Sequence, residues 1–153
     1  MLVIPRSWHE IQALRAKPTG EAARDSDRKK TFRSALRQAE EFAEAAEVVT
    51  YATKPIQLLY ALSQAGRALA AARSPHPWTL RGHGLECRSE GAKILRATVE
   101  PNSSTQAAAF QVVTAAAGSP VLAGKAQIGA LWAANPDLST CRYVQSSGNG
   151  RPH

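Results

Sequence analysis

The chain has 153 residues, of which 44% are hydrophobic and 20% are charged, and its formal net charge is +7. This length suffices for one domain with its own core, and the hydrophobic content excludes a chain that is disordered throughout. The basic excess permits nucleic acid, anionic metabolites or an acidic protein surface as partners without choosing among them. The chain contains no apolar run near the ~20 residues that a membrane-spanning helix needs, so we expect no contact with a membrane.

Alanine dominates the apolar residues, and aromatic residues reach only 6%. Alanine favours helix and buries little area per residue. We therefore predict a mainly α fold, an irregular helical bundle around a buried central helix, with one or two short β-strands. We expect a single helical domain over residues 1–138 and a disordered tail over residues 139–153, where periodicity is lost.

The first predicted element is a short helix that begins with a capping box. Ser7 and Glu10 have the spacing in which each side chain caps the other residue's amide. The helix carries Trp8, Ile11 and Leu14 on one face and ends at residues 17–20. Residues 21–27 read as a polar connection.

A long helix is predicted from about Ser26 to Val49, where apolar residues recur at three- and four-residue steps. Its first half is basic and its second half acidic, against the preference of the helix dipole. The acidic side chains, placed on the solvent side, are Glu40, Glu41, Glu44 and Glu47. The candidate nucleic-acid-binding residues are Arg28, Lys29, Lys30, Arg33 and Arg37, with a solvated mixed-charge surface as the alternative.

The central helix is predicted to open at residues 53–55 and to run from Ile56 to about Ala72. It is nearly apolar all round, which is typical of a buried helix. Ser63, Gly66 and Ala70 are small positions at which another helix can approach closely. Arg67 is a polar exception that needs a partner if it is buried and otherwise extends its charge into water.

The loop Arg81-Gly82-His83-Gly84-Leu85 is the most suggestive stretch for function. Flanking glycines permit backbone angles that other residues resist. A histidine held there can donate to an anion or transfer a proton. The alternative is a tight turn whose histidine is bonded locally and fixes the loop.

Three smaller elements follow the glycine-rich loop. Alternation over residues 93–99 predicts a strand. A helix around residues 110–117 is stopped by Gly118 and Pro120, and a last short helix spans residues 125–134.

The sequence contains no complete catalytic or metal-binding motif. The stretch from Gly118 to Lys125 misses the P-loop spacing and its hydroxyl residue. His83 and Cys87 lie four apart without the further ligands that zinc requires, so we expect no metal and no cofactor. Cys87 and Cys141 form no CxxC pair, and with no export signal we expect a cytoplasmic protein with free thiols.

Residues 47–55, the run Leu58-Leu59-Tyr60-Ala61-Leu62 and Gly82-His83-Gly84-Leu85 together resemble the YaaC-like family of bacterial proteins. In that family an Ala-Thr-Lys/Arg-Pro helix start precedes a Leu- and Tyr-rich helix, and His-Gly-Leu follows a loop. The resemblance runs from about Arg28 to Leu138. It implies no established reaction, and it implies that this domain is the N-terminal portion of a longer family fold.

The candidate ligand-binding residues are Lys54, Tyr60, Arg67, Arg81 and His83. Their convergence in one pocket favours chemistry or a small ligand, and their dispersal leaves only the surface for function. The favoured function is a non-catalytic interaction or regulatory protein with an unknown protein partner or a second copy. The alternatives are a nucleic-acid or anion binder through residues 28–37 and an enzyme that uses the His83 loop.

Overall fold

The computed structural model describes residues 5–75, 78–89, 93–102 and 108–135, which fall into two compact units. The first unit comprises the described residues within 1–85 and 101–123, and the second those within 86–100 and 124–153. The architecture is mainly α with one small three-stranded sheet, so the predicted fold class is confirmed. The single domain over residues 1–138 stays a prediction, and residues 139–153 lie outside the described residues.

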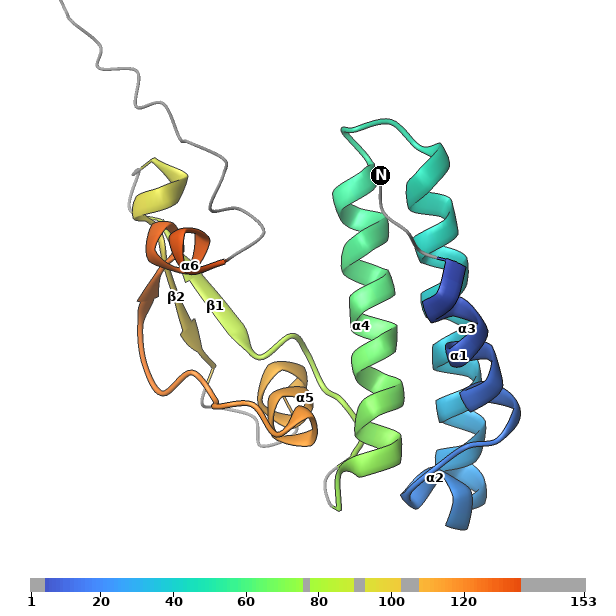
Figure 1. The fold of residues 1–153 in the computed structure, drawn as a ribbon. Helices are drawn as coiled ribbons and strands as arrows, with labels where there is room; N and C mark the ends of the chain where they lie inside the picture. Colours follow the sequence, from blue (N-terminus) through green and yellow to red (C-terminus); the bar gives the residue numbers. More distant parts are fainter. Residues whose placement is uncertain (1–4, 76–77, 90–92, 103–107, 136–153) are drawn as a thin grey trace, which may run out of the picture. The chain divides into compact units, whose positions relative to one another are not determined.

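The first unit is a helical assembly in which α3 and α4 lie side by side (Figure 1). Helix α4 also packs against α2 and α5, while α3 also packs against α1 and α2, so the α3–α4 pair forms the centre of this unit. The bounds of the helices are α1 Pro5–Ala16, α2 Glu21–Arg24, α3 Ser26–Val48, α4 Lys54–Arg73 and α5 Ala109–Ala117. No described helix is both long enough and apolar enough to span a bilayer.

The start of the chain differs from the prediction in two places. Helix α1 begins at Pro5, so Ser7 lies inside the helix and the predicted capping box is wrong. The predicted polar connection contains the single turn of α2, and Asp25 then caps α3. The Asp25 carboxylate accepts hydrogen bonds from the backbone N–H groups of Arg28 at 2.8 Å and Asp27 at 2.9 Å. The Arg28 N–H foremost, and then the Asp27 N–H, lower the pKa of Asp25 below its ordinary value.

The core of the first unit is built from small side chains. Its buried members are Phe32 and the alanines Ala22, Ala35, Ala68, Ala71 and Ala72, with Leu36 and Trp78 packed against them. Alanine-rich faces let helices approach closely, which multiplies dispersion contacts although each side chain buries little area. Gly66 is the extreme case, since a Cβ there would lie 2.9 Å from Cγ2 of Val113 on α5. The predicted close approach at Gly66 is therefore confirmed.

Arg28 is buried, with 5% of its surface exposed, and it binds the C-terminal end of α4. Its Nη1 donates to the carbonyls of Ser74 at 2.6 Å and Ala71 at 3.3 Å, and its Nη2 donates to that of Pro75 at 2.6 Å. Its guanidinium also lies over the Trp78 ring, 5.0 Å from the ring centroid. A cation at a helix C-terminus is stabilised by the dipole and by carbonyls that have no partner inside the helix. Arg28 therefore has a structural role, and its guanidinium is not exposed as the nucleic-acid prediction expected; nucleic-acid binding itself stays a prediction.

Glu40 is also buried, which corrects its placement on the solvent side of the long helix. Its carboxylate accepts from Arg15 Nη1 at 2.8 Å and from the side-chain amide of Gln12. This pair of contacts holds α1 against α3. The other three glutamates of α3 are exposed, and Glu41 forms the expected pair with Arg37 at 2.8 Å.

The two halves of helix α4 differ in how deeply their side chains are buried. Its C-terminal half buries Gly66, Ala68 and the run Ala70–Ala72, as predicted. In its N-terminal half the large apolar side chains stay substantially exposed, with Leu59 at 51% and Leu62 at 73%. Burial along the whole helix was thus wrong for this half, where Ala61 is buried while the large apolar side chains keep much of their surface in water.

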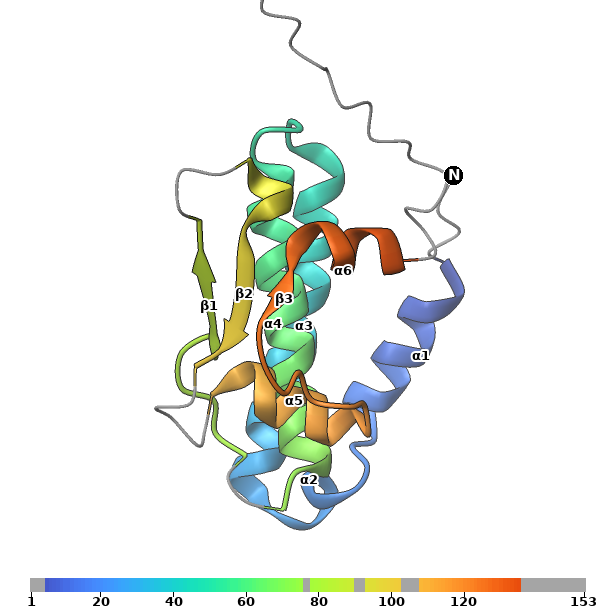
Figure 2. The ribbon, with the colours of Figure 1, turned by 90° about the vertical axis from the view of Figure 1, so that its left-hand side faces the viewer.

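The second unit contains the sheet in the order β1-β2-β3, and Figure 2 shows the three strands side by side. Strands β2 and β3 are antiparallel, with Thr98 opposite Gln127 and Val99 opposite Ala126. The elements are β1 Leu85–Arg88, the 3-10 turn η1 Ile94–Arg96, β2 Thr98–Pro101, β3 Ala126–Gln127 and α6 Ile128–Ala134. The strand predicted over residues 93–99 is wrong for its first part, which forms η1, and the last helix begins at Ile128 after a short strand.

We expect Arg28→Met to destabilise the chain by about 3 kcal/mol, because the substitution leaves buried carbonyls without a donor and removes the cation from Trp78. Urea denaturation followed by circular dichroism measures the change. The matched control is Lys29→Met at the neighbouring position, which we expect to stay within about 0.5 kcal/mol of the wild type. Equal stability of the two variants would contradict the role assigned to Arg28.

We expect the stabilising effect of the Asp25 charge to depend on pH. Because the pKa of Asp25 is lower in the folded chain than in the unfolded one, the stabilisation is present above the unfolded pKa and is lost as the pH falls through the folded pKa. Asp25→Asn keeps a capping oxygen and removes the charge. Denaturation at pH 7 and pH 3 should show a deficit of Asp25→Asn that shrinks at the lower pH; a deficit that is the same at both would contradict this assignment.

Candidate functional site

A hollow of about 500 Å³ lies between α4, α5 and the loop that precedes β1, entirely within the first unit. We call it the α4–α5 hollow. Its apolar lining consists of Leu59, Leu62, Gly66, Leu80, Gly82, Leu85, Ala109, Phe110 and Val113. Its polar lining consists of Tyr60, Ser63, Gln64, Arg67 and His83. Sites of this volume with apolar walls and a few polar groups are typical of binding surfaces.

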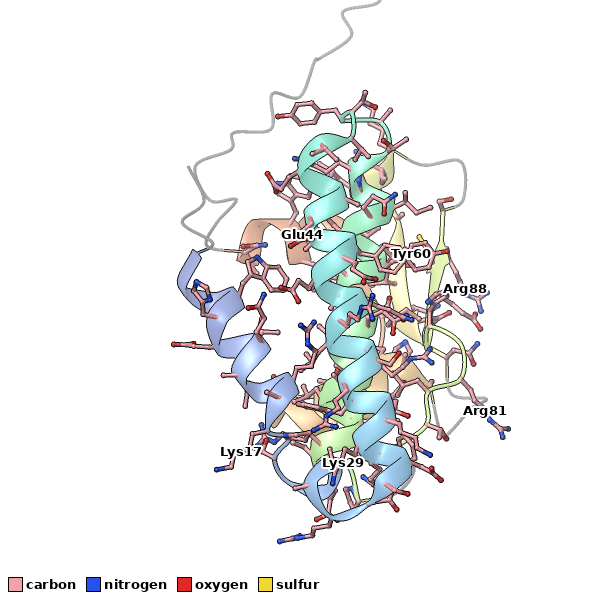
Figure 3. All side chains as sticks on the ribbon, turned by 90° about the vertical axis from the view of Figure 1, so that its right-hand side faces the viewer. Lys17, Lys29, Glu44, Tyr60, Arg81 and Arg88 are labelled. Atoms are coloured by element: carbon pink, nitrogen blue, oxygen red, sulfur yellow. The ribbon has the colours of Figure 1, made fainter. Side chains whose placement is uncertain are left out.

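Helix α4 forms one wall because its side chains recur at helical spacing. Leu59, Leu62 and Gly66 lie three and four residues apart and therefore share one face of the helix. Tyr60 adjoins this face, and its ring stacks on Phe42 of α3 with ring centroids 5.3 Å apart. Figure 3 shows Tyr60 beside α3. The stacking fixes the orientation of an aromatic ring that lines the hollow.

The His83 loop forms the opposite wall and is attached to the start of α5. The Phe110 N–H donates to the His83 carbonyl at 3.1 Å, and the Gln111 side-chain amide donates to the Gly84 carbonyl at 3.1 Å. Gly82 and Gly84 both have positive φ, 61° and 81°. A Cβ at Gly84 would lie 2.8 Å from the Cβ of Ala108, so this position requires glycine both for its φ and for space. Both glycines thus adopt backbone angles that other residues resist.

Three of the five candidate ligand-binding residues line the α4–α5 hollow, namely Tyr60, Arg67 and His83. Arg67 is exposed, so it extends its charge into water and does not need the partner that a buried arginine would require. Lys54 lies in the first turn of α4 and does not line the hollow. Arg81 does not line it either, and its side chain points away from the ribbon in Figure 3.

The basic residues of α3 do not form one free patch. Arg33 donates to the carbonyls of Arg15 at 3.1 Å and Ala16 at 3.0 Å and so caps the end of α1. Arg37 is paired with Glu41, and Lys30 lies 3.6 Å from the Asp27 carboxylate. With Arg28 buried, Lys29 is the member of the set whose side chain makes no ion pair or hydrogen bond in the described part of the chain.

The sequence reasoning missed the contribution of α5 to the hollow. Phe110 and Val113 of α5 line it. The helix itself was predicted, but its packing against α4 was not. The sequence indicated this packing in part, because the glycine at position 66 of the apolar helix leaves room for a branched side chain of a neighbouring helix, here Val113. Within the described residues no three His, Cys, Asp or Glu side chains gather as a metal ion would need. Cys87 is exposed and free, and Cys141 lies outside the described residues.

The fold is that of a mainly helical protein with a largely apolar hollow that Arg67 and His83 also line. The model of the YaaC-like Protein family matches residues 7–151, so the chain belongs to the YaaC-like family. The match confirms the resemblance and extends it in both directions along the chain. No curated protein and no solved structure matches the chain.

We expect Gly84→Ala to destabilise the chain more than Gly82→Ala. Both substitutions place a Cβ on a residue with positive φ, at about 1–2 kcal/mol each. Gly84→Ala adds a clash with Ala108, while a Cβ at Gly82 meets nothing within 4 Å. Thermal unfolding of the two variants should differ by about 1 kcal/mol or more, as overpacking costs; a larger loss for Gly82→Ala would contradict the assigned geometry.

Proposed function

We propose that this YaaC-like protein is a non-catalytic interaction protein that binds an apolar, acid-flanked segment of a protein partner in the α4–α5 hollow. The observation that carries the proposal is the exposure of large apolar side chains on one helix face. Leu62 is 73% exposed, Leu59 51% and Tyr60 46%, and all three line the hollow. Scattered exposed leucines are ordinary, but a contiguous cluster in a concave surface is typical of a docking site.

The charge of the hollow supports an acidic partner. The ionisable side chains that line it are Tyr60, Arg67 and His83, and no carboxylate is among its described lining residues. Complementary charges at the edge of an apolar contact speed association and select the partner. A segment with leucine-type side chains for the hollow and carboxylates beside Arg67 and His83 satisfies both features.

The hollow is better suited to a protein segment than to an enclosed small molecule. Small-molecule sites bury most of their ligand's surface, whereas Leu59 and Leu62 keep 51% and 73% of their own surface in water even though they line the site. An amphipathic helix that presents side chains at three- and four-residue steps covers such an open surface. The proposed partner is therefore an amphipathic, acidic segment of another protein. Binding of a second copy of this chain is distinguished from it by sedimentation.

The test compares two fluorescent helical peptides that share one leucine spacing, one flanked by Glu and the other by Lys. Anisotropy should show tighter binding of the Glu-flanked peptide. We expect Leu62→Asp to weaken that binding by about tenfold or more, because it places a carboxylate in the apolar contact. The matched control is Val48→Asp, since Val48 is 86% exposed on α3 and does not line the hollow.

Several outcomes would overturn this assignment. One is an absence of binding by both peptides, and another is an equal loss in Leu62→Asp and Val48→Asp. Sedimentation provides the third arm: a dimer that Leu62→Asp converts to monomer would show that a second copy occupies the hollow. Circular dichroism of both variants establishes that they fold, because both positions are exposed.

A further inference from the structure

We propose that a polar groove between α3 and α4 binds a phosphoryl group, either as inorganic phosphate or as the phosphate of a small phosphomonoester. The groove encloses about 320 Å³ and lies within the first unit. Its polar lining is Lys30, Thr31, Ser34 and Gln38 from α3 and Gln64 and Arg67 from α4. We call it the α3–α4 groove.

The spacing of these residues gives the groove two walls. Lys30, Ser34 and Gln38 are four residues apart and lie on one face of α3. Gln64 and Arg67 are three apart on α4 and share a face in the same way. Because α3 and α4 pack against each other along their length, these two faces border one seam.

Every polar side chain of the groove can donate a hydrogen bond. The set has an ammonium, a guanidinium, two hydroxyls and two amides, and the described lining includes no carboxylate. A phosphoryl group offers three strong acceptor oxygens and carries about −1.5 to −2 charges at neutral pH. Two cations and four neutral donors match that charge and number of acceptors more closely than they match the two oxygens of a single carboxylate.

The two cations of the groove are available for a ligand. Arg67 is the single charged residue between Pro55 and Ala72, and its side chain makes no hydrogen bond or ion pair in the described part of the chain. A guanidinium presents a planar fork of donors that suits two phosphate oxygens at once. Lys30 is 3.6 Å from Asp27 in a pair that is exposed on both sides, so its ammonium can change partner at little cost.

The surroundings favour a small phosphate over a nucleic acid. Farther along α3, Glu41, Glu44 and Glu47 are exposed and would repel an extended polyanion that followed the seam. Arg28, at the other end, is buried against α4. The cationic stretch is therefore short, which suits one phosphoryl group and not a run of phosphates.

The test measures binding of inorganic phosphate and of phenyl phosphate by isothermal titration calorimetry. Two matched pairs are used: Lys30→Gln with Lys29→Gln, and Arg67→Gln with Arg73→Gln. In each pair both residues carry the same charge, and only the first lines the groove. We expect the first of each pair to weaken binding about tenfold and the second to change it less than about twofold.

The two ligands separate the sources of the phosphoryl group. Tighter binding of inorganic phosphate identifies the free ion, and tighter binding of phenyl phosphate identifies an organic ester. An absence of binding by both, or equal losses in both members of the pairs, would overturn the proposal, since equal losses indicate diffuse attraction by net charge. Duplex DNA that binds more tightly than either ligand and weakens equally in Lys29→Gln and Lys30→Gln would also overturn it.

The groove is tested independently of the interaction proposed for the hollow. Leu62 lines the hollow and not the groove. We therefore expect Leu62→Asp to keep phosphate binding, measured in the same titration, while it loses the peptide. A parallel loss of both ligands in this variant would overturn the assignment of phosphate to the groove.

Discussion

The contact between Arg28 and the last turn of α4 is the interaction on which the first unit depends. A buried guanidinium donates to the Ala71 carbonyl in that last turn and to the Ser74 and Pro75 carbonyls that follow it, and Trp78 covers its face. The alanine-rich seam offers few large side chains that would fix one register between α3 and α4. Arg28 fixes that register from one end, and the stacked Phe42 and Tyr60 rings fix it farther along. Both candidate sites lie along helices that are aligned in this way.

The division of α4 into two kinds of surface explains why a hollow exists beside it. Ala68 and Ala71 face α3 and allow close packing, and Gly66 admits Val113 of α5. The larger Leu59 and Leu62 are therefore left on the side that α3 does not cover. The His83 loop, bonded through its carbonyls to the start of α5, closes this side into a concave surface. The hollow follows from small residues being used for helix contact and large ones being left at its edge.

Much of the fold could be predicted from the sequence, and the site only in part. Periodicity located α3 and α4 to within a residue or so, and the Gly118 stop of α5 was correct. The role of Arg28 was missed because a cation in a basic run reads as solvated, although it lies four residues before Phe32 on the apolar stripe. Glu40 was missed for the same reason, since its partner Arg15 comes from another helix. Tertiary partners of charged residues are not encoded in local spacing, and this limited the site more than the fold.

Gln64 and Arg67 line both the α4–α5 hollow and the α3–α4 groove, so the two sites share part of one helix. A charge at Arg67 therefore contributes to both surfaces, and its contribution cannot be divided between them by substitution at that position alone. Leu62 lines only the hollow and Lys30 only the groove. These two residues separate the sites physically: one lies on the apolar face of α4 and the other on α3, across the seam. Arg67, the single charged residue between Pro55 and Ala72, thus lies at the border between an apolar and a polar surface. Its guanidinium can bind a ligand in either of them.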